Sequence, residues 1–320
     1  MSLTLNDFEL ASKRISGILY KTPMVSARTF SEMTNNEVYL KCENQQKTGA
    51  FKIRGAYNKI SKIAEEGKIK NVIAASAGNH AQGVAYAAKV LGLKSIIVMP
   101  ETAPFAKQDA TARYGAEVIL AGNFFDDAFK KALEVQKATG AEFIHPFDDL
   151  DVIAGQGTIG IEILRDMPFV DVIIVPVGGG GLISGIAAYI KHTFGHVRII
   201  GVQAKNCSPI VSMFNGKEII MSEMSSTIAD GIAVKKPGGI TMGLINQYVD
   251  DVISVSETEI AKALLLLLER KKMLVEPSGA TTLAALLSGK ADLYGKKVVC
   301  VLSGGNIDIS KLNSVLEMAR

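Results

Sequence analysis

The chain has 320 residues, of which 48% are hydrophobic and 21% are charged, and its formal net charge is +3. This composition is that of an ordinary globular protein and excludes a disordered chain, and the small net charge excludes a basic nucleic-acid-binding surface. The four histidines and three cysteines show no metal-ligand spacing such as CxxC or HExxH, so we expect no metal site.

The cysteines indicate the compartment. Cys42, Cys207 and Cys300 lie far apart in the sequence and are odd in number, which disfavours a disulfide framework and favours a reducing environment. No uncharged apolar run approaches the roughly 18 residues of a membrane span. The first ten residues include acidic side chains, which disfavours a signal peptide. We therefore expect a cytoplasmic protein that binds neither membrane nor nucleic acid.

Strand-like and helix-like segments alternate along the chain. Short runs rich in β-branched residues are separated by helical patterns, which is typical of βαβ units and a parallel sheet. Segment 205–245 is the least regular, and we expect it to be loop. A helix is predicted at 6–19 and a strand at 37–43, followed by strands at 71–76, 94–100, 116–122 and 141–146, and by a second set at 170–177, 197–204, 251–256 and 296–303.

Four consecutive glycines follow the strand predicted at 170–177. In "PVGGGGLISG" they lie where a helix begins, and there unpaired main-chain N–H groups and the helix dipole favour an anion. Glycines have no Cβ to keep an anion at a distance. The alternative is a tight strand-to-helix turn. The dinucleotide and Walker A fingerprints both fail here, which predicts a smaller phosphate ester as the ligand.

Two further loops join a strand to a helix. In "SAGNHAQG", Ser76, Asn79 and His80 bring polar side chains to a helix N-terminus that would suit a carboxylate. Helix capping is an equally good interpretation of these residues. The third loop, "VLSGGN" (301–306), by itself favours a capping turn.

A lysine stands between two large apolar residues in "KTGAFKIRGAYNKI" (47–60). If Lys52 is desolvated by Phe51 and Ile53, its amine loses affinity for its proton and can attack a carbonyl. The cofactor that joins a lysine imine to a phosphate ester is pyridoxal 5′-phosphate. The alternative is a surface lysine on an amphipathic helix, because lysines are usually exposed.

Seven motifs in order give a resemblance to a known family. "KTGAFKIRGA", "SAGNHAQG", "AGQGTIGIEIL", "PVGGGGLISG", "TIADG", "EPSGA" and "LSGGN" resemble the fold-type II pyridoxal-phosphate enzymes, most closely the threonine/serine dehydratases of the short biodegradative group. The resemblance implies an α/β fold of the tryptophan synthase β type, with two open parallel-sheet lobes and helices on both faces. It also implies a small domain at 48–146, a large cofactor-binding domain at 1–47 and 147–320, and a homodimer or homotetramer.

The resemblance also assigns site residues. Lys52 matches the Schiff-base lysine and general base, and Phe51 packs near the cofactor ring. Asn79 matches the partner of the ring hydroxyl, and Ser303 the partner of the pyridine nitrogen. The carboxylate-binding positions are Ser76, Asn79 and His80, the phosphate loop is Gly178, Gly179, Gly180, Gly181 and Leu182, and Glu276 and Gly231 line the cofactor pocket.

The activity implied is β-elimination and deamination of L-threonine, and of L-serine, to a 2-oxo acid and ammonia. Serine racemases share most of the motifs, but their pattern has a serine where this chain has Ala77 and an acidic metal ligand where it has Gln203. Both differences favour the dehydratase. A synthase that adds a nucleophile stays an alternative, and so does a non-catalytic α/β ligand-binding protein in which Lys52 is structural.

Overall fold

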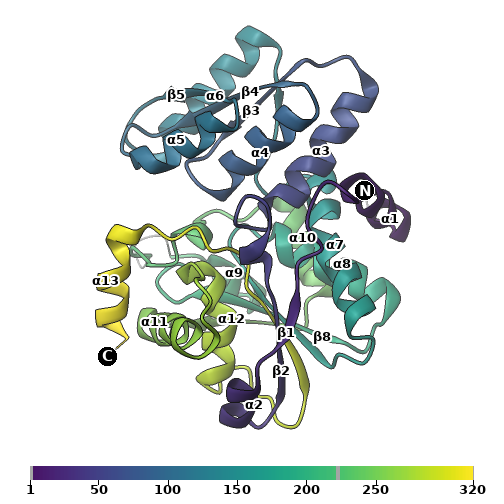
Figure 1. Ribbon diagram of the computed structural model, residues 1–320, viewed down its shortest axis with the longest axis vertical. Helices are drawn as coiled ribbons and strands as arrows, with labels where there is room; N and C mark the ends of the chain where they lie inside the picture. Colours follow the sequence, from purple (N-terminus) through teal and green to yellow (C-terminus); the bar gives the residue numbers. More distant parts are fainter. Residues whose placement is uncertain (1–2, 221–223, 320) are drawn as a thin grey trace.

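Two parallel sheets organise the fold. The computed structural model describes residues 3–220 and 224–319, and it places a four-stranded sheet and a six-stranded sheet in separate parts of the molecule (Figure 1). Helices cover both faces of each sheet. The predicted α/β class with two open, largely parallel sheets is therefore confirmed.

The four-stranded sheet has the order β5-β4-β3-β6, and all its strands are parallel. Alternate residues of β3 face opposite sides, as the two-residue period of a strand requires. Val72 and Ala74 pack toward α3 and α4, whereas Ile73 and Ala75 pack toward α6. The strands are β3 (Asn71–Ala75), β4 (Lys94–Met99), β5 (Glu117–Leu120) and β6 (Glu142–Phe143), and the helices between them are α4 (Asn79–Val90), α5 (Phe105–Arg113) and α6 (Phe125–Thr139).

The six-stranded sheet has the order β1-β2-β10-β7-β8-β9. All neighbours are parallel except β1, which pairs antiparallel with β2 at one edge. Strand β2, from the N-terminal part of the chain, thus lies beside β10, which comes from the C-terminal part. The strands are β1 (Met24–Ser26), β2 (Glu37–Lys41), β7 (Val172–Pro176), β8 (Arg198–Ala204), β9 (Asp251–Val255) and β10 (Lys297–Val301).

Helices of the six-stranded part pack on the two faces of its sheet. On one face Ile174, Ile200 and Cys300 contact α11 and α12, and on the other Ile173 and Val299 contact α8. The remaining helices are α1 (Leu5–Ile15), α2 (Arg28–Thr34), α3 (Lys52–Glu66), α7 (Leu150–Asp166), α8 (Gly181–Thr193), α9 (Pro209–Phe214), α10 (Gly239–Tyr248), α11 (Glu257–Leu266), α12 (Pro277–Leu287) and α13 (Ile309–Met318). No helix in the described ranges is long and apolar enough to cross a membrane.

The prediction of loop for 205–245 was wrong, because α9 lies within this segment and α10 begins in it. Helix α10 contains Gly239 and Gly243, which lower its intrinsic propensity. The helix forms because tertiary contacts stabilise it: Asp148, distant in the sequence, accepts hydrogen bonds from two main-chain N–H groups of its first turn. Strand β1 and helix α2 were also not predicted, because each is too short to show a clear period.

Helix α3 packs tightly between α4 and α7. On one side a Cβ on Gly83 of α4 would lie 3.2 Å from Ile53 Cα. On the other side a Cβ on Gly155 of α7 would lie 2.6 Å from both Arg54 O and Gly55 Cα. Glycines on both neighbours therefore let the main chain of α3 approach closely, and this contact fixes the helix that begins at Lys52.

We expect Gly155→Ala to lower the free energy of unfolding by about 1–3 kcal/mol, because the new methyl group meets main-chain atoms of α3 that have no room to move. The measurement is urea denaturation followed by circular dichroism. The control is Gly243→Ala, at an exposed helical position with open space around it. We expect this substitution to raise the free energy of unfolding by up to about 1 kcal/mol. Equal stability of the two variants would contradict the close α3–α7 contact.

Candidate active site

Lys52 is the first residue of α3, and its amine lies against a main-chain carbonyl. The Nζ atom donates a hydrogen bond to Pro146 O at 2.7 Å and lies 5.3 Å from the centre of the Phe51 ring. The side chain is partly buried. Burial lowers the pKa of Lys52 to about 8, and the nearby Glu276 carboxylate opposes this shift. This environment differs from that of a solvated surface lysine.

Asn79, Glu276 and Asn306 form a connected set of polar side chains. Asn79 Nδ2 donates to both carboxylate oxygens of Glu276, at 2.9 and 3.2 Å, and Asn306 Nδ2 donates to Asn79 Oδ1 at 2.8 Å. The Asn79 amide is therefore held in one orientation. Glu276 is 6% exposed, and burial raises its pKa to about 7, although the Asn79 hydrogen bond acts in the opposite direction.

The polar side chains of Asn79 and Glu276 have three further neighbours among the predicted site residues and their surroundings, namely Ser303, Gly304 and Gly231. The Phe51 N–H donates to Ser303 O at 3.0 Å, so the residue before Lys52 lies beside the end of β10. A Cβ on Gly304 would lie 2.5 Å from Glu276 Oε1, and one on Gly231 would lie 2.9 Å from Ser278 Oγ. The two glycines leave room for the buried Glu276 carboxylate.

The glycine run ends at the N-terminus of α8. Gly180 is the N-cap residue and has φ of +98°, a backbone conformation that favours glycine. The main-chain N–H groups of the first turn of α8 have no acceptor within the helix, as at any helix start. The space behind the run is filled: a Cβ on Gly179 would collide with the Phe147 ring, and one on Gly180 would lie 2.9 Å from Thr241 Cβ. Packing behind the loop is thus a reason for the glycines that the sequence did not reveal.

Ser76 lies in the loop before α4, and Asn79 and His80 are the first two residues of that helix. Neither Ser76 nor Asn79 caps the helix, because the N-cap residue is Gly78. Ser76 Oγ accepts from Gly78 N at 3.2 Å. His80 is 3% exposed and its Nε2 lies 2.8 Å from Ile144 O. Burial and the nearby Lys52 lower the pKa of His80 to about 3, so the imidazole is neutral at neutral pH and donates its Nε2–H to that carbonyl.

Buried ion pairs next to Lys52 were not predicted. Arg54 is fully buried, and its guanidinium binds Glu43 at 2.8 Å and Glu162 at 2.7 Å. Lys41 Nζ also binds Glu162, at 2.5 Å. Glu43 follows β2 and Glu162 lies on α7, so these charges tie the first turn of α3 to the six-stranded part of the protein. No periodic sequence signal marks such a pairing.

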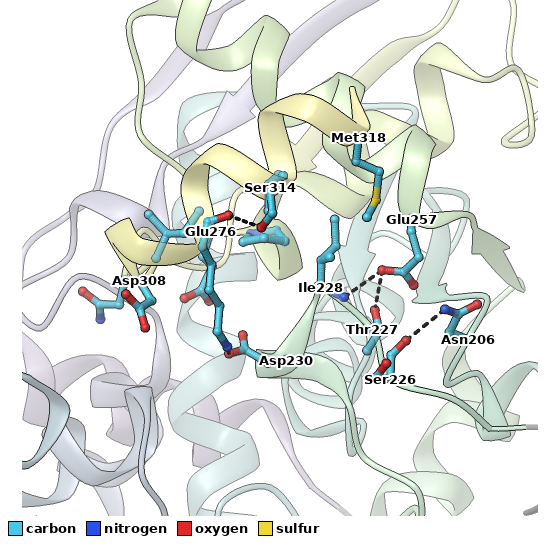
Figure 2. A pocket seen from close by; sticks show the side chains of 15 residues that line it. Asn206, Ser226, Thr227, Ile228, Asp230, Glu257, Glu276, Asp308, Ser314 and Met318 are labelled. Carbon is cyan, nitrogen blue, oxygen red and sulfur yellow. Dashed lines mark hydrogen bonds and ion pairs between the residues drawn. The ribbon is translucent and has the colours of Figure 1, made fainter. Parts of the chain in front are cut away.

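A cavity of about 330 Å³ lies next to Glu276, whose side chain is part of its lining (Figure 2). Asp230 on its wall lies 3.8 Å from Lys107 of α5 and 3.6 Å from Lys311 of α13. Glu257 accepts hydrogen bonds from Thr227 Oγ1 and from the main-chain N–H of Ile228. The lining includes Glu276 and Asn306, but neither Lys52 nor the glycine run. Among the described residues no cluster of three or more His, Cys, Asp or Glu could hold a metal ion.

Contacts thus bring the sequence-predicted residues together. Phe51 touches Ser303, Asn79 touches Glu276, and Gly231 lies beside Glu276. Gly178 lies close to the residue after Gly231, because a Cβ on Gly178 would be 3.1 Å from Ile232 Cα. The sequence matches the family described as pyridoxal-phosphate dependent enzymes over residues 15–304. The chain belongs to that family.

Relatives within the family agree with this assignment. The chain is 50% identical over 314 residues to an L-threonine ammonia-lyase of Thermotoga maritima, covering 98% of this chain and 78% of that protein. It is 45% identical over 317 residues to the L-threonine dehydratase catabolic TdcB of Escherichia coli K12, covering 98% of this chain and 96% of the relative. The structure of maize serine racemase superposes with a TM-score of 0.93 at 36% identity, covering 99% of this chain and 98% of that one. The predicted membership of the pyridoxal-phosphate enzymes is confirmed.

The residues present fit the family's cofactor. Pyridoxal phosphate needs an amine with a lowered pKa, an anion site and polar partners for its ring. Lys52 has the amine, with a carbonyl rather than a carboxylate as its hydrogen-bond partner. The glycine run offers main-chain N–H groups at a helix N-terminus. Asn79 and Ser303 have polar side chains that would suit the ring, and Ser303 is 2% exposed.

If Lys52 is the residue that attaches pyridoxal phosphate, we expect the rate at which the apoprotein takes up the cofactor to rise with pH through a midpoint of about 8, because only the uncharged amine can attack the aldehyde and the pKa of Lys52 is lowered to about 8. Uptake is followed by visible absorbance in stopped-flow mixing. Glu276→Gln removes a negative charge that favours the lysine's proton, so its midpoint moves to lower pH.

The control for this experiment is Glu257→Gln, which changes a carboxylate of the neighbouring cavity and leaves the midpoint where it is. A wild-type midpoint near 10.5, the ordinary lysine value, would contradict the buried environment of Lys52.

Proposed function

We propose that the protein is a threonine ammonia-lyase, which converts L-threonine to 2-oxobutanoate and ammonia and L-serine to pyruvate and ammonia. Water is lost in the elimination and regained when the nitrogen is released, so the overall products are the 2-oxo acid and ammonia. The observation that carries the proposal is the Lys52 amine, partly buried and held on Pro146 O at 2.7 Å. Two relatives at 45% and 50% identity bear the name of this activity.

Lys52 is the proposed attachment residue and general base. When bound, pyridoxal phosphate withdraws electrons from the substrate and makes its α-hydrogen acidic. Lys52 would then accept that proton at Nζ. A base is most effective when its pKa is near the working pH, and the lowered pKa of about 8 suits this role far better than that of an exposed lysine.

The phosphate is assigned to the glycine loop. Gly178, Gly179, Gly180 and Gly181 lead into α8, and Leu182 is in its first turn. Their main-chain N–H groups and the helix dipole would hold the dianion without any cationic side chain. Phe51 would pack near the cofactor ring, at the start of α3.

Asn79 and Ser303 would contact the ring. Asn79 has its amide orientation set by Glu276 and Asn306, which prepares it for the ring hydroxyl. The Ser303 hydroxyl would contact the pyridine nitrogen. A carboxylate in that place would hold a proton on the nitrogen, whereas a hydroxyl would not. A hydroxyl at Ser303 would thus make the bound cofactor a milder electron sink, which would favour elimination because the leaving group carries the electrons away. Glu276 and Gly231 would line the pocket.

The substrate carboxylate is assigned to the loop before α4. Ser76 Oγ accepts one local bond and keeps its O–H to donate. The His80 imidazole is engaged with Ile144 O, so His80 would contribute its main-chain N–H in the first turn of α4. Asn79 precedes it in the same turn. This helix N-terminus favours an anion for the same reason as that of α8.

A serine racemase is the second candidate, and its support is the structural match to the maize enzyme. Two residues oppose it. Ala77 has only a methyl group where that family's pattern has a serine able to move a proton. Gln203 is fully buried, its Nε2 donates to Val177 O at 3.3 Å and its Oε1 accepts from Val211 N at 3.0 Å. The nitrogen and the oxygen of this amide therefore both form hydrogen bonds with the main chain.

We also propose that residues 48–146 form a small domain and that residues 1–47 and 147–320 form a large one. We propose the cytoplasm as the place of action, in keeping with three buried free cysteines. A homodimer or homotetramer stays a prediction.

We expect Lys52→Ala to lower the rate of ammonia and 2-oxobutanoate release from L-threonine by at least about 10²-fold, the usual worth of a general base. Both products are measured by coupled assays. Lys62→Ala on the same helix is the control, because its side chain binds Asp151 at the surface, and it keeps the wild-type rate. Equal rates for Lys52→Ala and the wild type would remove the assignment.

With L-serine as substrate, we expect pyruvate and no D-serine, because Ala77 cannot move a proton on the second face of the substrate. Chiral chromatography of the reaction mixture measures both compounds. D-serine formed by the wild-type protein at a rate comparable to pyruvate would favour the racemase instead.

A further inference from the structure

The glycine loop is held from behind by residues that belong to none of the motifs. We propose that Asp148 and Thr241 are positioning residues that orient the main chain of Gly179–Gly180 for the cofactor phosphate. This inference rests on the proposed function, which assigns the phosphate to that loop.

Thr241 forms the direct contact. It is fully buried in the first turn of α10, and its Oγ1 donates a hydrogen bond to Gly179 O at 2.7 Å. In a trans peptide unit the carbonyl of one residue and the N–H of the next point in opposite directions. Because Thr241 holds the Gly179 carbonyl toward α10, the Gly180 N–H points away from α10.

The loop conformation depends on this contact. Gly180 has φ of +98°, and a Cβ there would lie 2.9 Å from both Thr241 Cβ and Ile245 Cδ1 of α10. Helix α10 therefore lies directly on the loop. Ser184 of α8 adds a second tie, because its Oγ donates to Thr241 O at 3.2 Å. Thr241, at the start of α10, thus contacts both the glycine loop and the first turn of α8.

Asp148 holds Thr241 in place. Its carboxylate accepts from Thr241 N at 2.9 Å and from Gly239 N at 3.1 Å, and so caps α10 across the fold. Gly238 leaves the space that this carboxylate fills, since a Cβ there would collide with it. The carboxylate also lies at the positive end of the helix dipole, which adds to the stabilisation.

The same segment reaches Lys52. Pro146, two residues before Asp148, presents the carbonyl that accepts from Lys52 Nζ at 2.7 Å. His145 Nδ1 accepts from Asp148 N at 2.7 Å and fixes the turn between them. Phe147 packs its ring against Gly179. Segment 145–148 therefore connects the amine to the loop, and sets the distance between the two groups that would hold opposite ends of the cofactor.

Neither Asp148 nor Thr241 is assigned a contact with the cofactor. Their effect is expected in the affinity for the phosphate and not in the rate of the fully loaded enzyme. A comparison of pyridoxal phosphate with pyridoxal, which lacks the phosphate, isolates that contribution.

The experiment titrates the apoprotein with each aldehyde and follows visible absorbance. We expect Thr241→Val to weaken pyridoxal phosphate binding about tenfold, the effect of one buried hydrogen bond, and to change pyridoxal binding less than about twofold. Thr241→Ser restores the hydroxyl and the affinity. Asp148→Asn keeps the shape of the side chain but loses its charge, and we expect the same selective loss. A changed ³¹P resonance of the bound phosphate in Thr241→Val would be the spectroscopic sign of the altered loop.

The matched control is Thr111→Val. Thr111 is also a buried helical threonine, with Oγ1 donating to Lys107 O at 2.9 Å, and its replacement leaves both affinities unchanged. The proposal is overturned if Thr241→Val and Asp148→Asn bind both aldehydes as the wild type does, if they weaken both equally, or if Thr241→Ser is as weak as Thr241→Val. A wild-type protein that binds pyridoxal as tightly as pyridoxal phosphate would instead overturn the phosphate assignment itself.

Discussion

The buried ion pairs of Arg54 are the interaction on which the site depends. Arg54 lies two residues after Lys52, and its guanidinium is held by Glu43 and Glu162. Burying these charges is costly unless every one is paired, and here the surrounding carboxylates raise the pKa of Arg54 while the guanidinium lowers that of Glu43. The first turn of α3 is therefore anchored to the six-stranded part of the fold, while Ile53 packs on α4 of the four-stranded part.

Burial is also the common cause of the site's electrostatics. It favours the uncharged form of each group, so the pKa of Lys52 falls to about 8, that of His80 falls to about 3, and that of Glu276 rises to about 7. The result is an amine available near neutral pH, an imidazole used as a neutral hydrogen-bond donor, and a carboxylate held by Asn79. In the proposed arrangement, an anionic cofactor would meet main-chain N–H groups at helix N-termini in place of charged side chains.

Sequence patterns predicted the elements that have a strong period of their own. The strands of both sheets are two to seven residues long, and most are rich in β-branched side chains. Each was predicted within a few residues, apart from the short edge strand β1. Helix α10 was missed because its two glycines weaken the local signal, and because its cap comes from Asp148, about 90 residues earlier in the chain. The same long-range contact, continued through Thr241, supports the glycine loop that the sequence did reveal.

By itself, the sequence determined the α/β class, the glycine loop after a strand, and the lysine flanked by apolar residues, because these depend on residue type and local spacing. Only the tertiary structure decided which groups surround them. Pro146, Arg54, Asn306 and Thr241 are distant in sequence from what they contact, and none carries a periodic signal. Hydrogen bonds and ion pairs between distant segments depend on how the two sheets and their helices pack. That packing buries the Lys52 amine and so lowers its pKa.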